Sequence, residues 1–246
     1  MATLTYVLIN VLTILVPLVR SFESRVNMFG KWKALFPAIF LTGFFFLVWD
    51  VWFTQMGVWG FNERYLSGIE MAGLPLGEYL FFLTVPYACI FVYEVLNYFI
   101  KKDHFAKVAR PVMLIGGVLL LVLAWVGRDQ WYSGLNFLLT GLWMLGMAWL
   151  NPRWMGRYLQ SYLVCIFPFL LVNGILTGSF IEEQVVWYND AENFGLRIFT
   201  IPVEDTAYAM LLLAMNTTFY EAFKKRMGIG EKALNTKLAV GSVAAG

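Results

Sequence analysis

Acidic residues recur at two corresponding places in the sequence, each beside a proline and among aromatic residues. Glu78 stands in PLGEYLFF, and the pair Glu204 and Asp205 stands in PVEDTAY. A further acid, Asp50, lies in WDVWF at the end of an apolar run. A carboxyl group inside a membrane span is costly and usually functional, and apolar surroundings disfavour its charged form. Such a group can stay protonated near neutral pH and protonate a carbon–carbon double bond.

Aromatic residues crowd both places, and they suit the cation that such a protonation creates. Ring faces stabilise a carbocation by cation–π attraction without acting as nucleophiles. The crowded positions are Trp49, Trp52, Phe53, Trp59, Phe61, Tyr79, Phe81 and Phe82 in the first copy and Trp187, Tyr188, Phe199 and Tyr208 in the second. From these residues and the amides within the apolar runs, we expect a substrate site formed by Trp49, Trp52, Tyr79, Phe82, Trp187, Tyr208, Asn173 and Asn216.

These residues also have simpler structural interpretations. Trp and Tyr are common at membrane interfaces, and an amide within a span often joins two helices. Glu78, Glu204 and Asp205 follow a proline at a helix start, where the helix dipole favours an acid, so they could be caps at the outer interface. Glu94 and Glu221 lie 16 residues further along the same runs. This separation is ~24 Å along a helix, so we expect them at the opposite interface, outside the site.

The elements that carry these residues have the composition of membrane spans. Of the 246 residues, 60% are hydrophobic and only 14% are charged, and the net charge is +2. This balance excludes a disordered chain and a nucleic-acid binder that depends on charge. A span needs roughly 20 apolar residues. We therefore expect an all-α membrane protein with seven transmembrane helices, at 3–19, 34–53, 79–99, 111–127, 131–150, 158–178 and 203–223.

The basic residues predict the orientation of these helices. Fifteen of the eighteen Lys and Arg residues follow the first, third, fifth and seventh runs, and only Arg64, Arg128 and Arg197 fall on the other side. The positive-inside rule then places the N-terminus outside and the C-terminus in the cytoplasm. No basic residue precedes the first run, so we expect an uncleaved span and not a signal peptide.

An internal repeat divides the chain. PLGEYLFFLTVPYACIFVYE, from Pro75, aligns with PVEDTAYAMLLLAMNTTFYE, from Pro202, and FPAIFLTG (36–43) aligns with FPFLLVNG (167–174). Because one span joins the two three-helix repeats, both should have the same topology, with the repeat axis along the membrane normal. The predicted divisions are a first repeat at 1–100, a linker with the fourth span at 101–130, a second repeat at 131–223 and a cytoplasmic tail at 224–246.

Several other chemistries have no support in the sequence. No GxGxxG motif follows a strand, no Walker A loop is present, and 203–223 contains no lysine for a retinal Schiff base. No Asp-rich motif that would hold a magnesium diphosphate is visible. His104 is the only histidine, and Cys89 and Cys165 lie inside apolar runs, so we expect no metal site and no disulfide framework.

The motifs LPLGEYLFF and IPVEDTAYAMLLLAMNTTFYE resemble the lycopene cyclase domain family of the small integral-membrane type, in its fused two-repeat form. The resemblance implies a lycopene β-cyclase, which converts lycopene through γ-carotene to β-carotene without net oxidation or reduction. It implies lycopene and the lipid bilayer as partners, beside other membrane enzymes of carotenoid biosynthesis, and a location in the bacterial inner membrane. We expect no cofactor, and the sequence leaves a role for reduced flavin open.

The resemblance also suggests roles for the acids. Glu78 and the pair of Glu204 and Asp205 would share the acid and base roles, with Asp50 delivering protons. Adjacent residues on a helix point ~100° apart, so we expect Asp205 to face the cavity and Glu204 to hold its proton or cap the helix. Gly77 stands where the family usually has a first acid, and at a first helical turn we expect it to tolerate a side chain. A non-enzymatic carotenoid- or retinal-binding protein, or a small-solute transporter that uses the two amides, remains the alternative.

Overall fold

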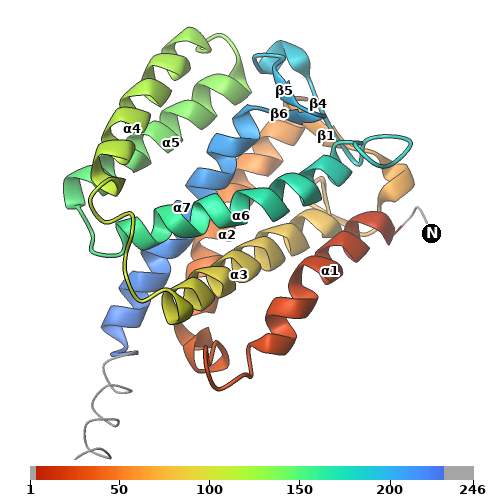
Figure 1. Ribbon diagram of the computed structural model, residues 1–246. Coiled ribbons are helices and arrows are strands. Elements are labelled where there is room, and N and C mark those ends of the chain that lie inside the picture. The colour runs from red at the N-terminus through yellow and green to blue at the C-terminus, as the bar shows by residue number, and fades with distance from the viewer. Residues whose placement is uncertain (1–3, 230–246) are drawn as a thin grey trace, which may run out of the picture.

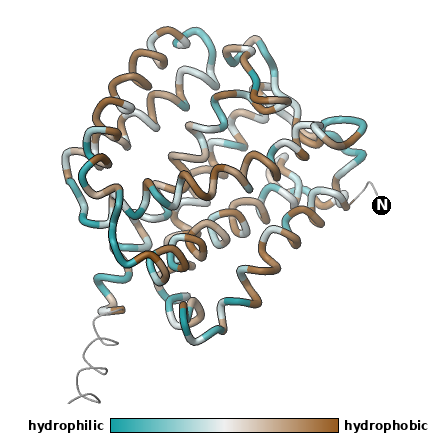
Figure 2. The backbone as a smooth tube through the Cα atoms, viewed as in Figure 1, coloured by the Kyte–Doolittle hydropathy of each residue, from teal (hydrophilic) through white to brown (hydrophobic). Residues whose placement is uncertain are grey.

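A computed structural model describes residues 4–229, and over this part the chain forms seven α-helices (Figure 1). Hydrophobic residues run along the helices, and hydrophilic residues gather in the connections at the two ends of the bundle (Figure 2). The helices are α1 (Thr5–Arg20), α2 (Trp32–Gln55), α3 (Leu76–Phe99), α4 (Ala109–Val126), α5 (Trp131–Leu150), α6 (Met155–Leu176) and α7 (Glu204–Arg226).

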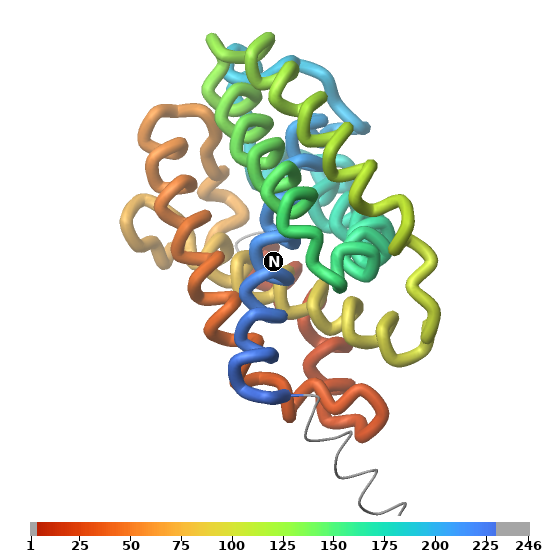
Figure 3. The backbone as a smooth tube through the Cα atoms, turned by 90° about the vertical axis from the view of Figure 1, so that its left-hand side faces the viewer, coloured from red at the N-terminus to blue at the C-terminus, as the bar shows by residue number. Residues whose placement is uncertain are grey.

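Five of these helices, α2 to α6, are long and apolar enough to cross a bilayer. The fold is therefore all-α and of the integral-membrane type, while seven complete spans remain a prediction. Helix α1 has 16 residues and falls short in length. Helix α7 is long enough but too polar, and it packs against α2, α3, α5 and α6 (Figure 3). Because protein surrounds so much of α7, it can carry acids and amides that lipid would not accept.

Two long connections, between α2 and α3 and between α6 and α7, contain short strands that were not expected from the sequence. β1 (Trp59–Phe61) pairs antiparallel with β4 (Val186–Tyr188). The pairing continues reciprocally, since the Asn62 N–H donates to the Val185 carbonyl and the Asn189 N–H donates to the Val58 carbonyl, both at 2.9 Å. Each connection also holds a small hairpin, β2 (Glu70–Met71) with β3 (Leu74–Pro75) and β5 (Arg197–Ile198) with β6 (Ile201–Pro202).

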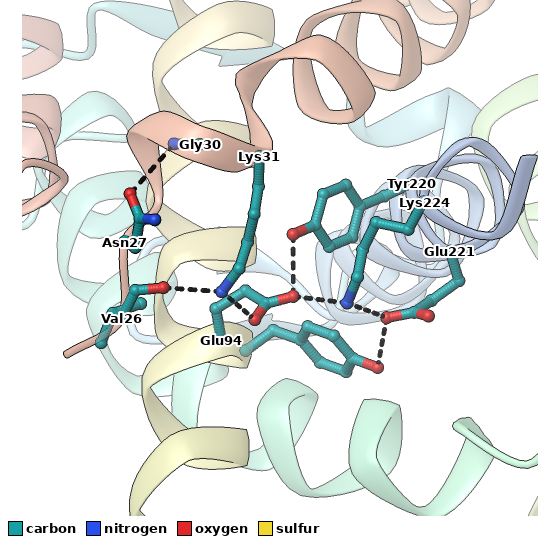
Figure 4. Close-up of polar contacts among 9 residues, drawn as sticks. Val26, Asn27, Gly30, Lys31, Glu94, Tyr220, Glu221 and Lys224 are labelled. Atoms are coloured by element: carbon teal, nitrogen blue, oxygen red, sulfur yellow. Dashed lines mark hydrogen bonds and ion pairs between the residues drawn. The ribbon is translucent and has the colours of Figure 1, made fainter. Parts of the chain in front are cut away.

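The opposite end of the bundle is joined by a polar cluster of Lys31, Tyr93, Glu94, Tyr220, Glu221 and Lys224 (Figure 4). Glu94 accepts from Lys31 at 2.6 Å and from Tyr220 and Lys224 at 2.7 Å. Tyr93 donates in turn to Glu221 at 2.9 Å. The paired contacts link α3 to α7, and they lie at the far end of these helices from Glu78 and Asp205.

Helix α7 continues through Arg226, into the range 224–246 that was predicted as a tail. Lys224 forms ion pairs with the carboxylates of Glu94 and Glu221. Lys232 and Lys237, which contributed to the predicted orientation, lie outside the described residues together with the rest of the tail.

Candidate active site

Three carboxyl groups from three different helices meet in one cavity of about 40 Å³. Asp50 comes from α2, Glu78 from α3 and Asp205 from α7, and all three are buried. The acids of the two halves therefore share one space. The remaining lining residues are mostly aromatic: Tyr6, Trp59, Phe61, Phe81, Tyr132, Phe169, Asn173, Leu176, Val186, Tyr188 and Tyr208.

Glu78 lies between a phenol and a second carboxyl group. The hydroxyl of Tyr6 donates to Oε2 of Glu78. The carboxyl group of Asp50 lies within hydrogen-bonding range of Glu78 on another side. Asp50 in turn accepts from the indole N–H of Trp59 at 2.5 Å. Among the described residues, Oδ2 of Asp50 is buried without a hydrogen-bond donor.

Asp205 has a different environment, made of three neutral donors. The hydroxyl of Tyr132 donates to Oδ1, and the amide of Asn173 and the hydroxyl of Tyr188 donate to Oδ2, the last at 3.1 Å. Burial, together with the nearby carboxyl groups of Asp205 and Glu78, raises the pKa of Tyr188 well above its usual value near 10. Tyr188 therefore remains a neutral phenol and keeps its proton to donate.

The same arrangement of a tyrosine and an asparagine positions the phenol in each half. Tyr6 and Asn10 are four residues apart on α1, as Tyr132 and Asn136 are on α5, so each pair lies on one helix face. The amide of Asn10 donates to the carbonyl of Gly77 at 2.9 Å, and the amide of Asn136 donates to the carbonyl of Glu204 at 2.7 Å. The first helix of each half is thereby tied to the start of the third, with its phenol on the acid.

The sequence analysis missed both Tyr6 and Tyr132. The segments TYVLIN and WYSGLN carry the tyrosine and the asparagine at an offset of 126, which is close to the offset of 127 between the acidic motifs. Extending the repeat alignment into the first helix of each half would have found them.

Glu204 points away from the cavity, unlike its neighbour Asp205. Its Oε1 accepts from the hydroxyl of Ser133 at 2.5 Å and from the backbone N–H of Phe194 at 2.9 Å. Glu204 therefore holds the start of α7 to α5 and to the connection that follows β4.

Glu182, an acid in the connection between α6 and α7, is not part of the cavity. Glu182 is exposed at the rim and forms an ion pair with Arg64 at 2.6 Å. The second half instead brings Asn173 to its acid, and Asn173 aligns with Thr42 of α2. The two halves thus surround their acids with different groups.

The expectation that Gly77 tolerates a side chain is wrong. A Cβ atom at this position would lie 2.4 Å from both Cγ and Cδ1 of Tyr6 and 2.9 Å from its Cβ. The first turn of α3 packs directly beneath the ring that binds Glu78, and only glycine leaves room for that ring.

The predicted substrate residues divide between the cavity and its surroundings. Tyr208 and Asn173 line the cavity, Trp49 packs on Tyr208 with ring centroids 5.4 Å apart, and Phe82 is buried against Phe46. The others point elsewhere. Trp52 and Trp187 are 43% and 41% exposed, the hydroxyl of Tyr79 donates to the Met71 carbonyl, and the amide of Asn216 donates to Leu212 of its own helix.

Trp187 and Tyr188 illustrate why this division was hard to foresee. Successive residues of a strand point to opposite faces, so in β4 Tyr188 lines the cavity while Trp187 covers Gly60 on the outside. From the sequence, Trp59 and Tyr188 were counted only among the crowded aromatic residues. The predicted elements were all helices, so these strands were not foreseen.

The described residues contain no group of three or more His, Cys, Asp or Glu side chains that could hold a metal ion. The residues that line the cavity can offer acid–base chemistry between carboxyl groups, with ring faces beside them and phenols and amides to fix the carboxyl groups in place.

A family model described as lycopene cyclase matches residues 3–96 and 129–223. No curated protein and no solved structure matches the chain. The two matched regions correspond to the two halves that meet at the cavity, and α4 lies in the gap between them. The family acts in carotenoid biosynthesis, which implies a carotenoid substrate and a lipid environment. The chain belongs to the lycopene cyclase family, as a member with two cyclase repeats fused in one polypeptide.

Proposed function

We propose that this protein is a lycopene β-cyclase that closes the ends of lycopene to β-rings in the cavity between its two halves. The observation that carries the proposal is the meeting of Asp50, Glu78 and Asp205 in one aromatic cavity, in a chain of this family. The product is an isomer of the substrate, because one proton is added and one is removed. The reaction therefore needs an acid, a base and protection of the cation between them.

The pair of Asp50 and Glu78 suits the acid. Two carboxyl groups in contact cannot both carry a charge without strong repulsion, so such pairs share a proton. With Asp50 holding the charge through the indole of Trp59, Glu78 is the proton donor to the terminal double bond. The resulting cation is attacked by the next suitable double bond of the chain, and the new carbon–carbon bond closes the six-membered ring.

Asp205 suits the base. Its three donors, Tyr132, Asn173 and Tyr188, all hydrogen-bond a carboxylate, and hydrogen bonds to the charged form favour it. Removal of a proton from the ring carbon next to the cation then creates the ring double bond. Because the hydroxyls of both tyrosines are bound to Asp205, neither is positioned to attack the cation.

The proposal includes the setting of the site. Redox state does not change in the isomerisation, so no bound cofactor is required for it. We assign the end with the cavity to the outer side of a bacterial inner membrane and the end with Lys31 and Lys224 to the cytoplasm, following the positive-inside rule. Other membrane enzymes of the pathway are the expected neighbours that supply and consume the carotenoids.

The test is expression in a bacterium that accumulates lycopene, with products separated by chromatography and protein amounts compared by blot. The parent should convert lycopene to β-carotene. Glu78→Gln and Asp205→Asn should each lose ~10²–10⁴ in rate, the usual contribution of general acid–base catalysis. Glu182→Gln, an exposed acid at the same end, is the control and should match the parent. The proposal fails if the parent leaves lycopene unchanged, or if both cavity variants cyclise it as the control does.

A further inference from the structure

An apolar groove runs along the lipid side of the bundle between α2 and α5. Its volume is about 570 Å³, and no charged residue lines it. The walls include Leu41 and Val48 of α2 and Leu135 and Leu139 of α5, with Phe219 of α7 between them. Figure 3 shows α7 lying between α2 and α5, and α7 packs against both.

The groove lies beside the acid cavity. Trp49 lines the groove, and its ring lies 5.4 Å from that of Tyr208, which lines the cavity. The linings of the two spaces are therefore in contact through these two rings. On the side of the strands, Trp52 meets Trp131 edge-on with centroids 5.5 Å apart, which brings α2 and α5 together there.

The sizes of the two spaces decide what each can hold. A cavity of about 40 Å³ has room for roughly three water-sized groups, so it accepts no more than an end of a long polyene. The rest of such a molecule has no polar group and must lie on an apolar surface. The groove next to the cavity offers one of suitable chemistry.

We propose that this groove binds the polyene chain of the substrate while one end of the molecule reaches past Trp49 into the acid cavity. The proposal rests on the proposed function, because that function supplies the substrate class. The ring pair of Trp49 and Tyr208 is then the point where the chain passes from the groove to the acids.

The test introduces a large side chain into the groove from each of its two walls, in the full-length protein. Leu139→Trp and Val48→Trp place an indole in the groove from α5 and α2. Leu138→Trp is the matched control, because Leu138 is the neighbour of Leu139 on α5 but faces a different surface, beside Trp125 and Arg128. Each variant is placed in liposomes and assayed with lycopene and with a shorter acyclic polyene that carries the same end group.

The groove variants should lose kcat/KM for lycopene by about tenfold or more, since displacing even two buried carbons costs about that factor. The short polyene should be cyclised at the parent's rate, and the control should match the parent on both substrates. The proposal is overturned if both groove variants cyclise lycopene like the parent, or if they lose both substrates equally. A parent that cyclises neither substrate would instead overturn the proposed function.

Discussion

Gly77→Ala is the smallest change that tests how the acid on α3 is held. The added Cβ would lie 2.4 Å from two ring atoms of Tyr6, a distance that packed atoms do not accept. Tyr6 is buried, its hydroxyl binds Glu78, and the amide of Asn10 fixes its helix to the carbonyl of Gly77 itself. Relief of the clash must therefore move α1 away from α3 or turn the ring away from its acid.

The expected magnitude follows from these two routes. Overpacking in a filled core costs about 1–3 kcal/mol, which lowers the free energy of unfolding. If the ring turns away, the hydrogen bond to the neutral carboxyl group of Glu78 is lost, and a bond between neutral groups is worth about 0.5–1.5 kcal/mol. At 1.36 kcal/mol for each factor of ten, cyclisation should fall by roughly two- to tenfold.

Gly146→Ala is the control for this experiment. Gly146 is also helical, in α5, but a Cβ there meets nothing within 4 Å, so alanine should leave activity unchanged and stabilise the helix by up to about 1 kcal/mol. Thermal unfolding in detergent and the rate of lycopene conversion are measured for both variants. Parent-like stability and activity of Gly77→Ala would refute the packing of Tyr6 on α3. Gly77→Glu, which the sequence alone suggested would be tolerated, should be worse than Gly77→Ala.

Three further predictions concern the two ends of the bundle. Tyr132→Phe should slow cyclisation less than Tyr6→Phe, because Asp205, the acid of the second half, keeps two other donors. The ratio of the two kcat values checks this, and a larger effect of Tyr132→Phe would contradict it. Glu94→Gln should lower the free energy of unfolding by about 2 kcal/mol, since charged hydrogen bonds are lost, and should leave kcat unchanged. A Tm equal to the parent's would argue against a structural role of the polar cluster around Glu94. A reporter inserted beside Arg64 should be external and one fused to the C-terminus cytoplasmic, and the reverse labelling would overturn the orientation.

Most of the helices could be predicted from the sequence, because an apolar run is a local signal. The run predicted at 131–150 matches α5, and the rise per residue alone separated Glu78 from Glu94 along α3. The repeat was equally accessible, since it required only an alignment of the chain with itself. Helix α7 shows the limit of apolarity as a signal, because its polar residues face protein and not lipid.

The contacts between elements were not accessible in the same way. The approach of Asp50 to Glu78 depends on how α2 and α3 pack, which the intervening strands and hairpin determine. The need for glycine at position 77 depends on Tyr6, and hence on the packing of α1 against α3. No periodicity or motif encodes either packing. From the sequence alone, each acid could therefore be assigned to a span, but its proximity to the other acids could not be predicted.

The two halves share a framework but differ in the groups around their acids, and this difference has a mechanistic consequence. A strictly symmetric pair would place identical carboxyl groups on the two sides of the cavity, with no distinction between donor and acceptor. Here the first half contributes Asp50 beside its acid and the second contributes Asn173, so one acid is paired with a carboxyl group and the other with neutral donors. The groove is asymmetric as well, because α1 and α6, the counterparts of α5 and α2, pack against each other. On the proposed mechanism, a cavity with one acid, one base and one groove acts on one end of a polyene at a time. Two rings on one molecule then require the one-ring intermediate to leave and bind again in the opposite direction.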